Sequence, residues 1–199
     1  MKTTPTHRIA LAMLILAMAV PANAEPAEFR IDEEHFSIGF LVEHIGYADT
    51  LGQFLEAEGS FVYDEAANEL HEGRVVIRAD SVFTNHERRD KHLRGDDFLG
   101  ADNHETIRFV ATEWQPGEDH PRRGTLKGDL TLLGETQPVS LDVTLNKSAE
   151  YPFGHGGYTL GISARTTIDR SEWGMTYGVE RDLVGDEVEL IFELEAIRQ

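Results

Sequence analysis

Alternation of apolar and polar side chains is the sequence feature that most constrains the fold. It recurs in eight segments after Glu28, and a strict two-residue period is typical of β-strands that bury one face and expose the other. Clean alternation also indicates an antiparallel sheet, because parallel strands are usually apolar on both faces. The side chains expected on the buried faces of the eight successive strands are Phe36, Ile38, Phe40 and Val42; Leu55, Ala57, Gly59, Phe61 and Tyr63; Val75, Ile77 and Ala79; Ile107, Phe109 and Ala111; Leu126, Gly128, Leu130 and Leu132; Val139, Leu141, Val143 and Leu145; Tyr158, Leu160, Ile162, Ala164, Thr166 and Ile168; and Val188, Leu190, Phe192, Leu194 and Ala196.

Turn-forming residues separate the predicted strands. Gly, Asn, Asp and Pro gather at residues 64–68, 117–124, 134–138 and 154–157, and these residue types favour the tight connections of antiparallel sheets. The second apolar segment, near residues 51–63, is predicted as one strand.

One segment, Thr84–Arg94, lacks the two-residue period and is almost wholly charged. Thr84 and Glu87 have the spacing of a capping box, in which each side chain bonds a free backbone N–H of the other residue, and Gly95 is typical of the position after a helix end. We expect a short helix of about three turns. Because this helix carries little apolar surface, it is predicted to form a lid, together with the residues up to Leu99, over one mouth of the fold.

The apolar strand faces must be buried against each other, since no amphipathic helix is available to cover them. A sandwich of two sheets and a closed barrel both satisfy this requirement. An eight-stranded barrel has the size at which the interior can hold one small ligand, and the apolar lining favours a long apolar molecule. Alternation shows which side chains are buried but not whether space remains between them. The pattern alone therefore fits a filled core as well as a ligand cavity.

The N-terminus has the three parts of a secretory signal peptide. Lys2 and Arg8 precede twelve apolar residues, 9–20, and Ala22 and Ala24 form the small-residue site after which cleavage is expected. Twelve residues are too few to span a bilayer, so no stable membrane insertion is expected. The working domain is predicted to be residues 25–199, exported from the cytoplasm.

Charge and cysteine content exclude several classes of function. The formal net charge is −18, and nucleic-acid binding draws on clustered Lys and Arg, so no nucleic-acid partner is expected. The chain has no cysteine, which excludes thiol catalysis, Cys-ligated zinc and iron–sulfur clusters.

Several segments in the same order along the chain resemble the YceI-like family of exported lipocalin-like proteins. The most specific are the RD-x-HL element at Arg89–Leu93 and the stretch LTLLGETQPV at 130–139. The other matching segments are FLVEHIGYADTLGQF (40–54), SVFTNHERRDKHLRGDDFL (81–99), IRF (107–109), GTLKGDLTLLGETQPVSLDV (124–143), RTTIDRSEWGM (165–175) and DEVELIFELEA (186–196).

The resemblance implies a single extended, antiparallel, eight-stranded lipocalin-like β-barrel in the periplasm. It also implies a hydrophobic channel that binds a polyisoprenoid, quinone, fatty or similar lipid-tailed molecule, without catalysis, for transport, storage or stress response. His104 and Glu105 depart from the family pattern before the 107–111 strand, so the adjoining loop is expected to differ. The ligand-contacting residues expected from the inward pattern and from the family positions are Phe36, Ile38, Phe40, Val42, His44, Arg89, Asp90, His92, Leu93, Phe98, Phe109, Leu130, Leu132, Leu141, Val143, Leu160, Ile162, Arg170, Leu190 and Phe192.

Three alternatives compete with lipid binding. A metal site is not expected, because His86 and His92 are six residues apart and lack the i, i+4 spacing of a helical zinc motif; no cofactor is expected either. The sequence has no G-x-S-x-G or S-x-x-K motif of a hydrolase, although acid–base chemistry on a lipid at His44 stays open. The third alternative is an interaction protein with a filled core, and a homodimer is compatible with each hypothesis.

Overall fold

The computed structural model describes residues 25–199, so the predicted signal peptide lies outside the described residues. Within that range strands dominate the fold, accompanied by the helix α1 (Glu87–Arg94) and three short 3-10 segments. The strands are β1 (Ala27–His44), β2 (Ala48–Phe54), β3 (Ala57–Asp64), β4 (Glu69–Arg78), β5 (Val82–Phe83), β6 (Thr106–Pro116), β7 (Arg123–Leu132), β8 (Glu135–Glu150), β9 (Tyr158–Asp169) and β10 (Val184–Arg198).

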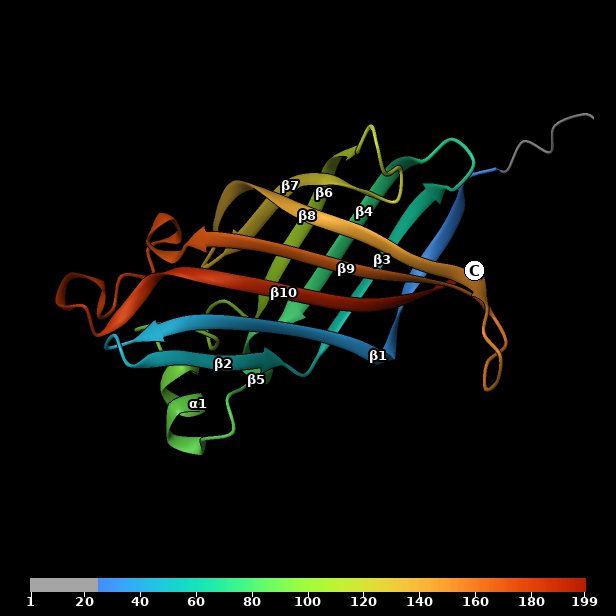
Figure 1. Ribbon diagram of the computed structural model, residues 1–199. Coiled ribbons are helices and arrows are strands. Elements are labelled where there is room, and N and C mark those ends of the chain that lie inside the picture. Colours follow the sequence, from blue (N-terminus) through green and yellow to red (C-terminus); the bar gives the residue numbers. More distant parts are fainter. Residues whose placement is uncertain (1–24) are drawn as a thin grey trace, which may run out of the picture.

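Eight of these strands close an elongated antiparallel barrel (Figure 1). The ring runs from β1 through β10, β9, β8, β7, β6, β4 and β3 back to β1. The first residues of β1 pair with β3, whereas its last residues, from Ile38, pair with β2. Strands β2 and β5 therefore extend the sheet beside β1 at the end where α1 lies. The all-β fold and the eight-stranded barrel are confirmed, and the choice between barrel and sandwich is settled by closure.

The alternating pattern places its apolar residues inside the barrel. Ile38 and Leu160 are each 1% exposed and Ala196 is fully buried, while Glu187 and Glu189, on the opposite face of β10, are exposed. Burial of these faces provides the main favourable term in folding, at about 25 cal/mol per Å² of apolar surface. Within residues 25–199, no helix has the length and apolar character needed to cross a membrane.

The prediction of one strand over residues 51–63 is wrong. The chain breaks between β2 and β3, where the backbone N–H groups of Leu55 and Glu56 donate to the carbonyl and hydroxyl oxygens of Ser81. The break changes the phase of the alternation, so Phe54 is inside at 8% exposure and Leu55 is outside at 54%. Leu55 was expected inside. The signal was missed because the two-residue period resumes directly after the break.

The helix starts later than the capping-box spacing predicts. Its N-cap is His86, whose Nδ1 accepts from the N–H of Arg89 at 3.3 Å. Thr84 instead donates its N–H and hydroxyl to the carboxylate of Asp90, so its side chain is not available as a cap. The helix has eight residues, about two turns and not three. It ends before Gly95, as predicted.

The predicted turn at 134–138 is shorter in the structure. Leu133 and Gly134 both have positive φ, 53° and 79°, which is typical of a two-residue hairpin turn. Strand β8 begins at Glu135, and Pro138 lies within it, opposite Asp129. The structure also has connections at 65–68, at 117–122 and, including the predicted 154–157, at 151–157, so Asp64 belongs to β3 and Gly124 to β7.

Candidate ligand-binding channel

The interior of the barrel is partly empty. A cavity of about 390 Å³ lies beneath α1, and a second cavity of about 140 Å³ continues toward the other end. We call the two together the channel. The two cavities share four lining residues, which lie where the cavities meet: Ile77, Leu130, Leu190 and Phe192. Side chains therefore do not fill the whole interior of the barrel.

A glycine lets an aromatic ring form part of the channel wall. Phe40 lines the larger cavity and pairs with Gly52 of β2. A Cβ atom at Gly52 would lie 2.1 Å from Cζ of Phe40, far closer than two carbon atoms approach. The tip of the ring therefore occupies the space that a side chain at residue 52 would fill.

The mouth beneath α1 carries several polar side chains. Arg89 donates from Nε to the Thr84 hydroxyl at 2.7 Å and from Nη2 to the Thr84 carbonyl at 2.6 Å. Nη1 of Arg89 has no hydrogen bond to any residue between 25 and 199. His92, also on α1, lies 3.0 Å from the Asp97 carboxylate through Nε2. The mouth can thus offer hydrogen-bond donors to a polar headgroup.

Three aromatic rings close together at this mouth. The ring centroids of His92, Phe98 and Tyr177 are 5.0 to 5.2 Å apart in each pair. Phe98 is buried, whereas Tyr177 is 42% exposed. The cluster joins α1 to the loop between β9 and β10, so it forms a boundary between the cavity and solvent.

Arg170 contacts the channel but is engaged mainly with the backbone. It is 3% exposed and donates to the carbonyl oxygens of Met175, Tyr177, Val184 and Gly185 at 2.6 to 3.0 Å. Burial lowers the pKa of Arg170, and the charge of Asp186 opposes this shift. Its guanidinium carbon also lies 5.7 Å from the centroid of Phe98. Arg170 thus holds the β9–β10 loop in place around the mouth.

The opposite end of the channel is held by a hydrogen-bonded group centred on Asn68. Oδ1 of Asn68 accepts from the Tyr63 hydroxyl at 2.5 Å and from Nε1 of Trp114 at 3.0 Å, and Nδ2 donates to the Pro121 carbonyl at 2.8 Å. Burial raises the pKa of Tyr63 to about 12, so its hydroxyl remains a donor at neutral pH. Tyr63 and Trp114 both line the smaller cavity.

The structure brings most of the expected ligand-contacting residues to the channel. The expected residues that line the larger cavity are Ile38, Phe40, Val42, His44, Arg89, His92, Leu93, Phe98, Leu130, Leu132, Arg170, Leu190 and Phe192. The smaller cavity adds Phe109, Leu141, Val143, Leu160 and Ile162.

Two expected residues lie elsewhere. Phe36 is partly buried, packs against the core and borders a groove, but it lines neither cavity of the channel. Asp90 is 5% exposed and binds Thr84 instead of facing either cavity. Both remain predictions as ligand contacts, and their positions favour structural roles.

The sequence pattern missed the channel residues contributed by irregular segments. Met175, Tyr177 and Leu183 come from the loop between β9 and β10, and Ile45 comes from the turn after β1. These segments have no two-residue period, so the only available signal was the presence of apolar residues in an otherwise polar loop. Trp114 lies on β6 beyond the register shift between Ala111 and Glu113, which breaks the alternation.

Comparison with known proteins gives consistent matches over nearly the whole described chain. The family model of the YceI-like domain matches residues 29–196. A UPF0312 protein of Pseudomonas aeruginosa is 36% identical over 195 residues, which is 95% of this chain and 97% of the relative.

Solved structures share the architecture. The crystal structure of the Campylobacter jejuni YceI protein is similar with a TM-score of 0.70 and 26% identity, covering 79% of this chain and 90% of that protein. A polyisoprenoid-binding domain from Saccharophagus degradans has a TM-score of 0.62 and 15% identity, over 88% of this chain and all of that domain. At 15% identity, the similarity to the Saccharophagus degradans domain shows a shared fold.

Proposed function

Because the chain belongs to the YceI-like family, we propose that it is a non-catalytic protein that binds one long apolar lipid inside the barrel. The polyisoprenoid, quinone and fatty classes share the required chemistry, a flexible hydrocarbon tail with a small polar head. The observation that carries the proposal is the channel itself, in which a larger and a smaller cavity share the apolar walls Leu190 and Phe192. A structural neighbour described as polyisoprenoid-binding supports the same class of ligand.

The two cavities suggest how such a ligand is oriented. The smaller cavity is enclosed chiefly by apolar side chains, so it suits the end of a tail, which gains about 0.8 kcal/mol per buried CH₂. The larger cavity has Arg89, His92 and His44 in its wall, and these side chains can satisfy the hydrogen bonds of a head. We therefore place the head at the mouth beneath α1.

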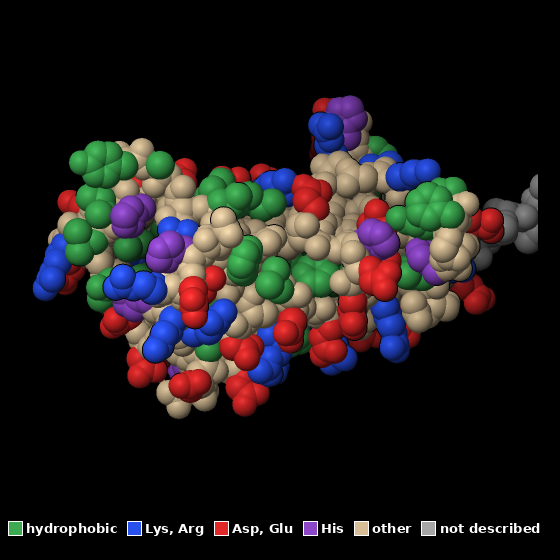
Figure 2. Space-filling model, turned by 90° about the horizontal axis from the view of Figure 1, so that it is seen from below, with side chains coloured by type: hydrophobic (Ala, Val, Ile, Leu, Met, Phe, Trp, Pro, Cys, Tyr) green, Lys and Arg blue, Asp and Glu red, His purple; other side chains and the backbone are tan. Residues whose placement is uncertain are grey.

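The rim of this mouth supports the same orientation. Ile45, Tyr177 and Leu183 line the larger cavity and are 45%, 42% and 37% exposed. Seen from the side of α1, hydrophobic side chains gather with histidines at this end of the molecule (Figure 2). An apolar rim lowers the cost of moving a tail from an aggregate or membrane into the channel. The lid, residues 84–99, and the β9–β10 loop then enclose the mouth.

Binding is proposed in preference to lipid modification because His44 has no chemical partner. Its ring makes no hydrogen bond or ion pair with the residues that the structure describes, although general acid–base catalysis needs a base held close to the reacting group. The predicted signal peptide and the family together support a periplasmic location, where the protein would carry or store its lipid or release it under stress. A homodimer remains a prediction.

The experiment is to purify the exported protein, extract it with organic solvent and identify the released compounds by mass spectrometry. Wild type is expected to release a lipid-tailed molecule, or to retain geranylgeraniol or palmitic acid after incubation when examined by native mass spectrometry. Leu141→Arg and Leu160→Arg place a charge in the channel and are expected to abolish retention or folding. Glu189→Arg, on the exposed face of β10, is the matched control and is expected to bind as wild type does.

Equal retention by all three variants would contradict the assignment of inner and outer faces. Failure of the folded wild type to retain either probe, or any extracted lipid, would contradict the proposed function.

A further inference from the structure

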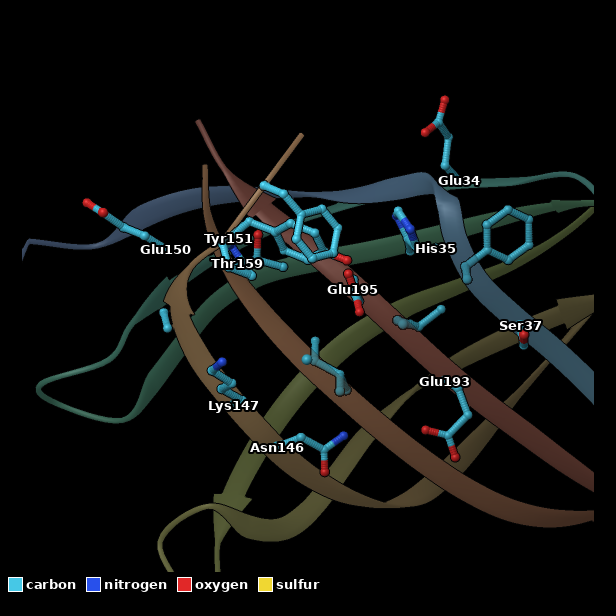
Figure 3. Close-up of a pocket in the computed structure, with 17 residues that line it drawn as sticks. Glu34, His35, Ser37, Asn146, Lys147, Glu150, Tyr151, Thr159, Glu193 and Glu195 are labelled. Carbon is cyan, nitrogen blue, oxygen red and sulfur yellow. The ribbon is translucent and has the colours of Figure 1, made fainter. Parts of the chain in front are cut away.

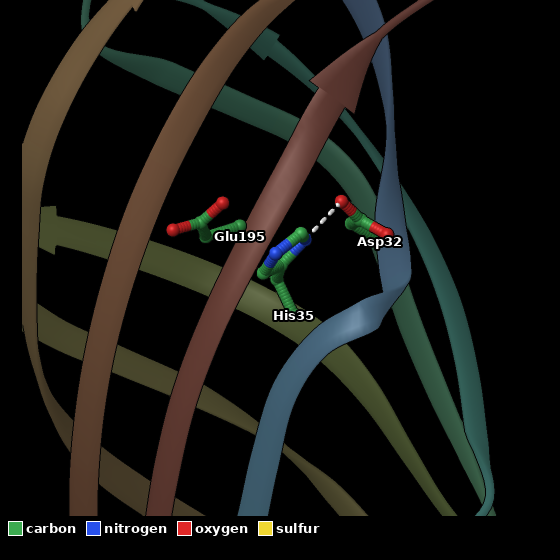
Figure 4. A group of neighbouring side chains, drawn as sticks. All are labelled: Asp32, His35 and Glu195. Carbon is green, nitrogen blue, oxygen red and sulfur yellow. Dashed lines mark hydrogen bonds and ion pairs between the residues drawn. The ribbon is translucent and has the colours of Figure 1, made fainter. Parts of the chain in front are cut away.

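The outer surface of the barrel contains a bulge that faces a single residue of the neighbouring strand. In the β1–β10 ladder, Ile31 pairs with Ala196 and Phe36 pairs with Leu194. Residues 32–35 of β1 therefore lie opposite Glu195 alone. A bulge of this kind re-aims side chains that regular pairing would point elsewhere, and here it turns Asp32 and His35 toward Glu195 (Figure 4).

The three side chains place metal-binding atoms close together. One nitrogen of His35 and one carboxylate oxygen each of Asp32 and Glu195 all lie within 4.8 Å of one another. Nδ1 of His35 is 2.8 Å from Oδ2 of Asp32, and Oδ1 of Asp32 accepts from the N–H of Glu34 at 2.9 Å. The side chain of Asp32 is 11% exposed. These contacts fix the positions of the first two groups.

Glu195 has a buried oxygen without a partner. Its Oε2 atom has less than 1 Å² of accessible surface and makes no hydrogen bond within residues 25–199, the only such side-chain atom found there. A buried carboxylate oxygen normally has a donor or a cation beside it, because leaving it unpaired is costly. A cation bound between β1 and β10 would supply the partner that this oxygen lacks.

A groove leads from solvent to this cluster (Figure 3). It has a volume of about 640 Å³ and is lined by His35 and Glu195 together with Tyr151 and Gly161. Gly161 of β9 is the residue paired with Glu195. The groove shares two wall residues, Ile162 and Leu194, with the smaller cavity, but His35 and Glu195 line the groove alone.

We propose that Asp32, His35 and Glu195 bind one divalent first-row transition ion, for which Zn²⁺ is a suitable probe. Imidazole nitrogen with carboxylate oxygen suits these ions better than Mg²⁺ or Ca²⁺, which prefer oxygen ligands alone. Ligand atoms about 2.1 Å from a tetrahedral ion lie roughly 3.4 Å apart, so small side-chain rotations complete the site. The ion replaces the proton that Nδ1 of His35 shares with Asp32, and this proton leaves to solvent.

The bound ion would join the bulge of β1 to β10 and stabilise the longest seam of the barrel. The carboxylates of Asp32 and Glu195 beside His35 place negative charge around the proposed position of the cation. This inference is independent of lipid binding, so either proposal can fail without the other.

The test is isothermal titration of the metal-free exported protein with zinc chloride. Wild type is expected to bind one saturable equivalent, and His35→Gln and Glu195→Gln are expected to weaken that site at least tenfold. The matched controls are the exposed His71→Gln and Glu189→Gln, which are expected to leave it unchanged. Absence of the one-equivalent site in wild type would overturn the proposal. So would zinc binding by His35→Gln and Glu195→Gln that is as tight as in wild type.

A thermal melt in EDTA separates metal loss from misfolding. Without metal, Glu195→Gln removes a buried unpaired charge, so its melting temperature is expected to equal or exceed that of wild type. Added Zn²⁺ is expected to raise the melting temperature of wild type and of the two controls, and not that of Glu195→Gln. A rise of the same size in Glu195→Gln would overturn the assignment of this ligand.

Discussion

The two ends of the channel are built differently. At the α1 end, irregular segments surround a cavity of about 390 Å³ with polar groups and a partly exposed apolar rim. At the opposite end, the strands enclose a smaller cavity of about 140 Å³. There Asn68 accepts hydrogen bonds from both Tyr63 and Trp114. The regular sheet thus supplies an apolar tube, and departures from regular structure supply its mouth. Changes at the two ends are expected to have different consequences, which the following variants examine.

Replacement of Arg170 at the mouth is expected to have the largest effect. Arg170→Ala leaves two carbonyls of the β9–β10 loop and two at the start of β10 without their donor. It also removes a buried guanidinium, and together these losses should lower the free energy of unfolding by about 3–5 kcal/mol. Arg170→Lys is expected to recover only part of this loss, because an ammonium cannot reach four carbonyls in the same plane. Urea denaturation measures the change. A loss below about 1 kcal/mol in Arg170→Ala would show that the loop is held by other contacts.

Asn68→Ala at the far end is expected to have a smaller effect, of about 2–3 kcal/mol, because it leaves the Tyr63 hydroxyl and Trp114 Nε1 unpaired. Asn68→Asp keeps an acceptor at the same place and is the control. Urea denaturation gives the stability, and titration with a short alcohol such as geraniol gives the binding. We expect geraniol binding to be retained in the folded fraction of Asn68→Ala; loss of binding at this end would contradict the proposed orientation.

Gly52→Ala tests the wall of the larger cavity. The added methyl group forces the Phe40 ring inward, which should cost about 1–3 kcal/mol of stability and reduce the room for a lipid. The double variant Gly52→Ala with Phe40→Leu removes most of the clash, so its lipid retention is expected to exceed that of the single variant. Native mass spectrometry compares the two. No recovery in the double variant would mean that Gly52 acts through the backbone and not through Phe40.

Tyr177→Ala is expected to have the smallest effect on folding, below about 1 kcal/mol, because the side chain is 42% exposed. Its effect on the ligand should be larger, since it opens the aromatic boundary at the mouth and speeds lipid dissociation. Tyr177→Phe keeps the ring and serves as the control. Stopped-flow displacement of a fluorescent fatty acid measures the rate. Equal dissociation rates in Tyr177→Ala and wild type would exclude this residue as part of the boundary.

The contrast between regular and irregular segments also determines what sequence reasoning could predict. The two-residue period identified the inward residues of the barrel, including Leu160 and Phe192, because pleating fixes which side chains share a face. It failed at Leu55, where a break held by Ser81 changes the phase, and at the β9–β10 loop, where Tyr177 has no periodic signal. The bulge between Ile31 and Phe36 was also missed, since it depends on the register between two strands distant in sequence.

Cavities pose a further limit, because the same alternation describes a filled and an empty core. The resemblance to the YceI-like family favoured the empty one, and the structure locates the space beneath α1. Arg89 and Arg170 differ in their hydrogen-bond partners although both positions match the family pattern. Only the hydrogen bonds distinguish them, since Arg170 is committed to backbone carbonyls while Nη1 of Arg89 is left without a partner among residues 25–199.

The most direct test of the account is the dependence of affinity on tail length. Isothermal titration with geraniol, farnesol and geranylgeraniol, which share a head and differ by whole isoprene units, reports the gain from each added segment. If the tail enters the channel, affinity should rise at each step, with an upper bound of about 0.8 kcal/mol per added CH₂, and Leu160→Arg should remove the dependence. Equal affinity for all three alcohols in wild type would mean that the tails stay outside the barrel and would contradict the account.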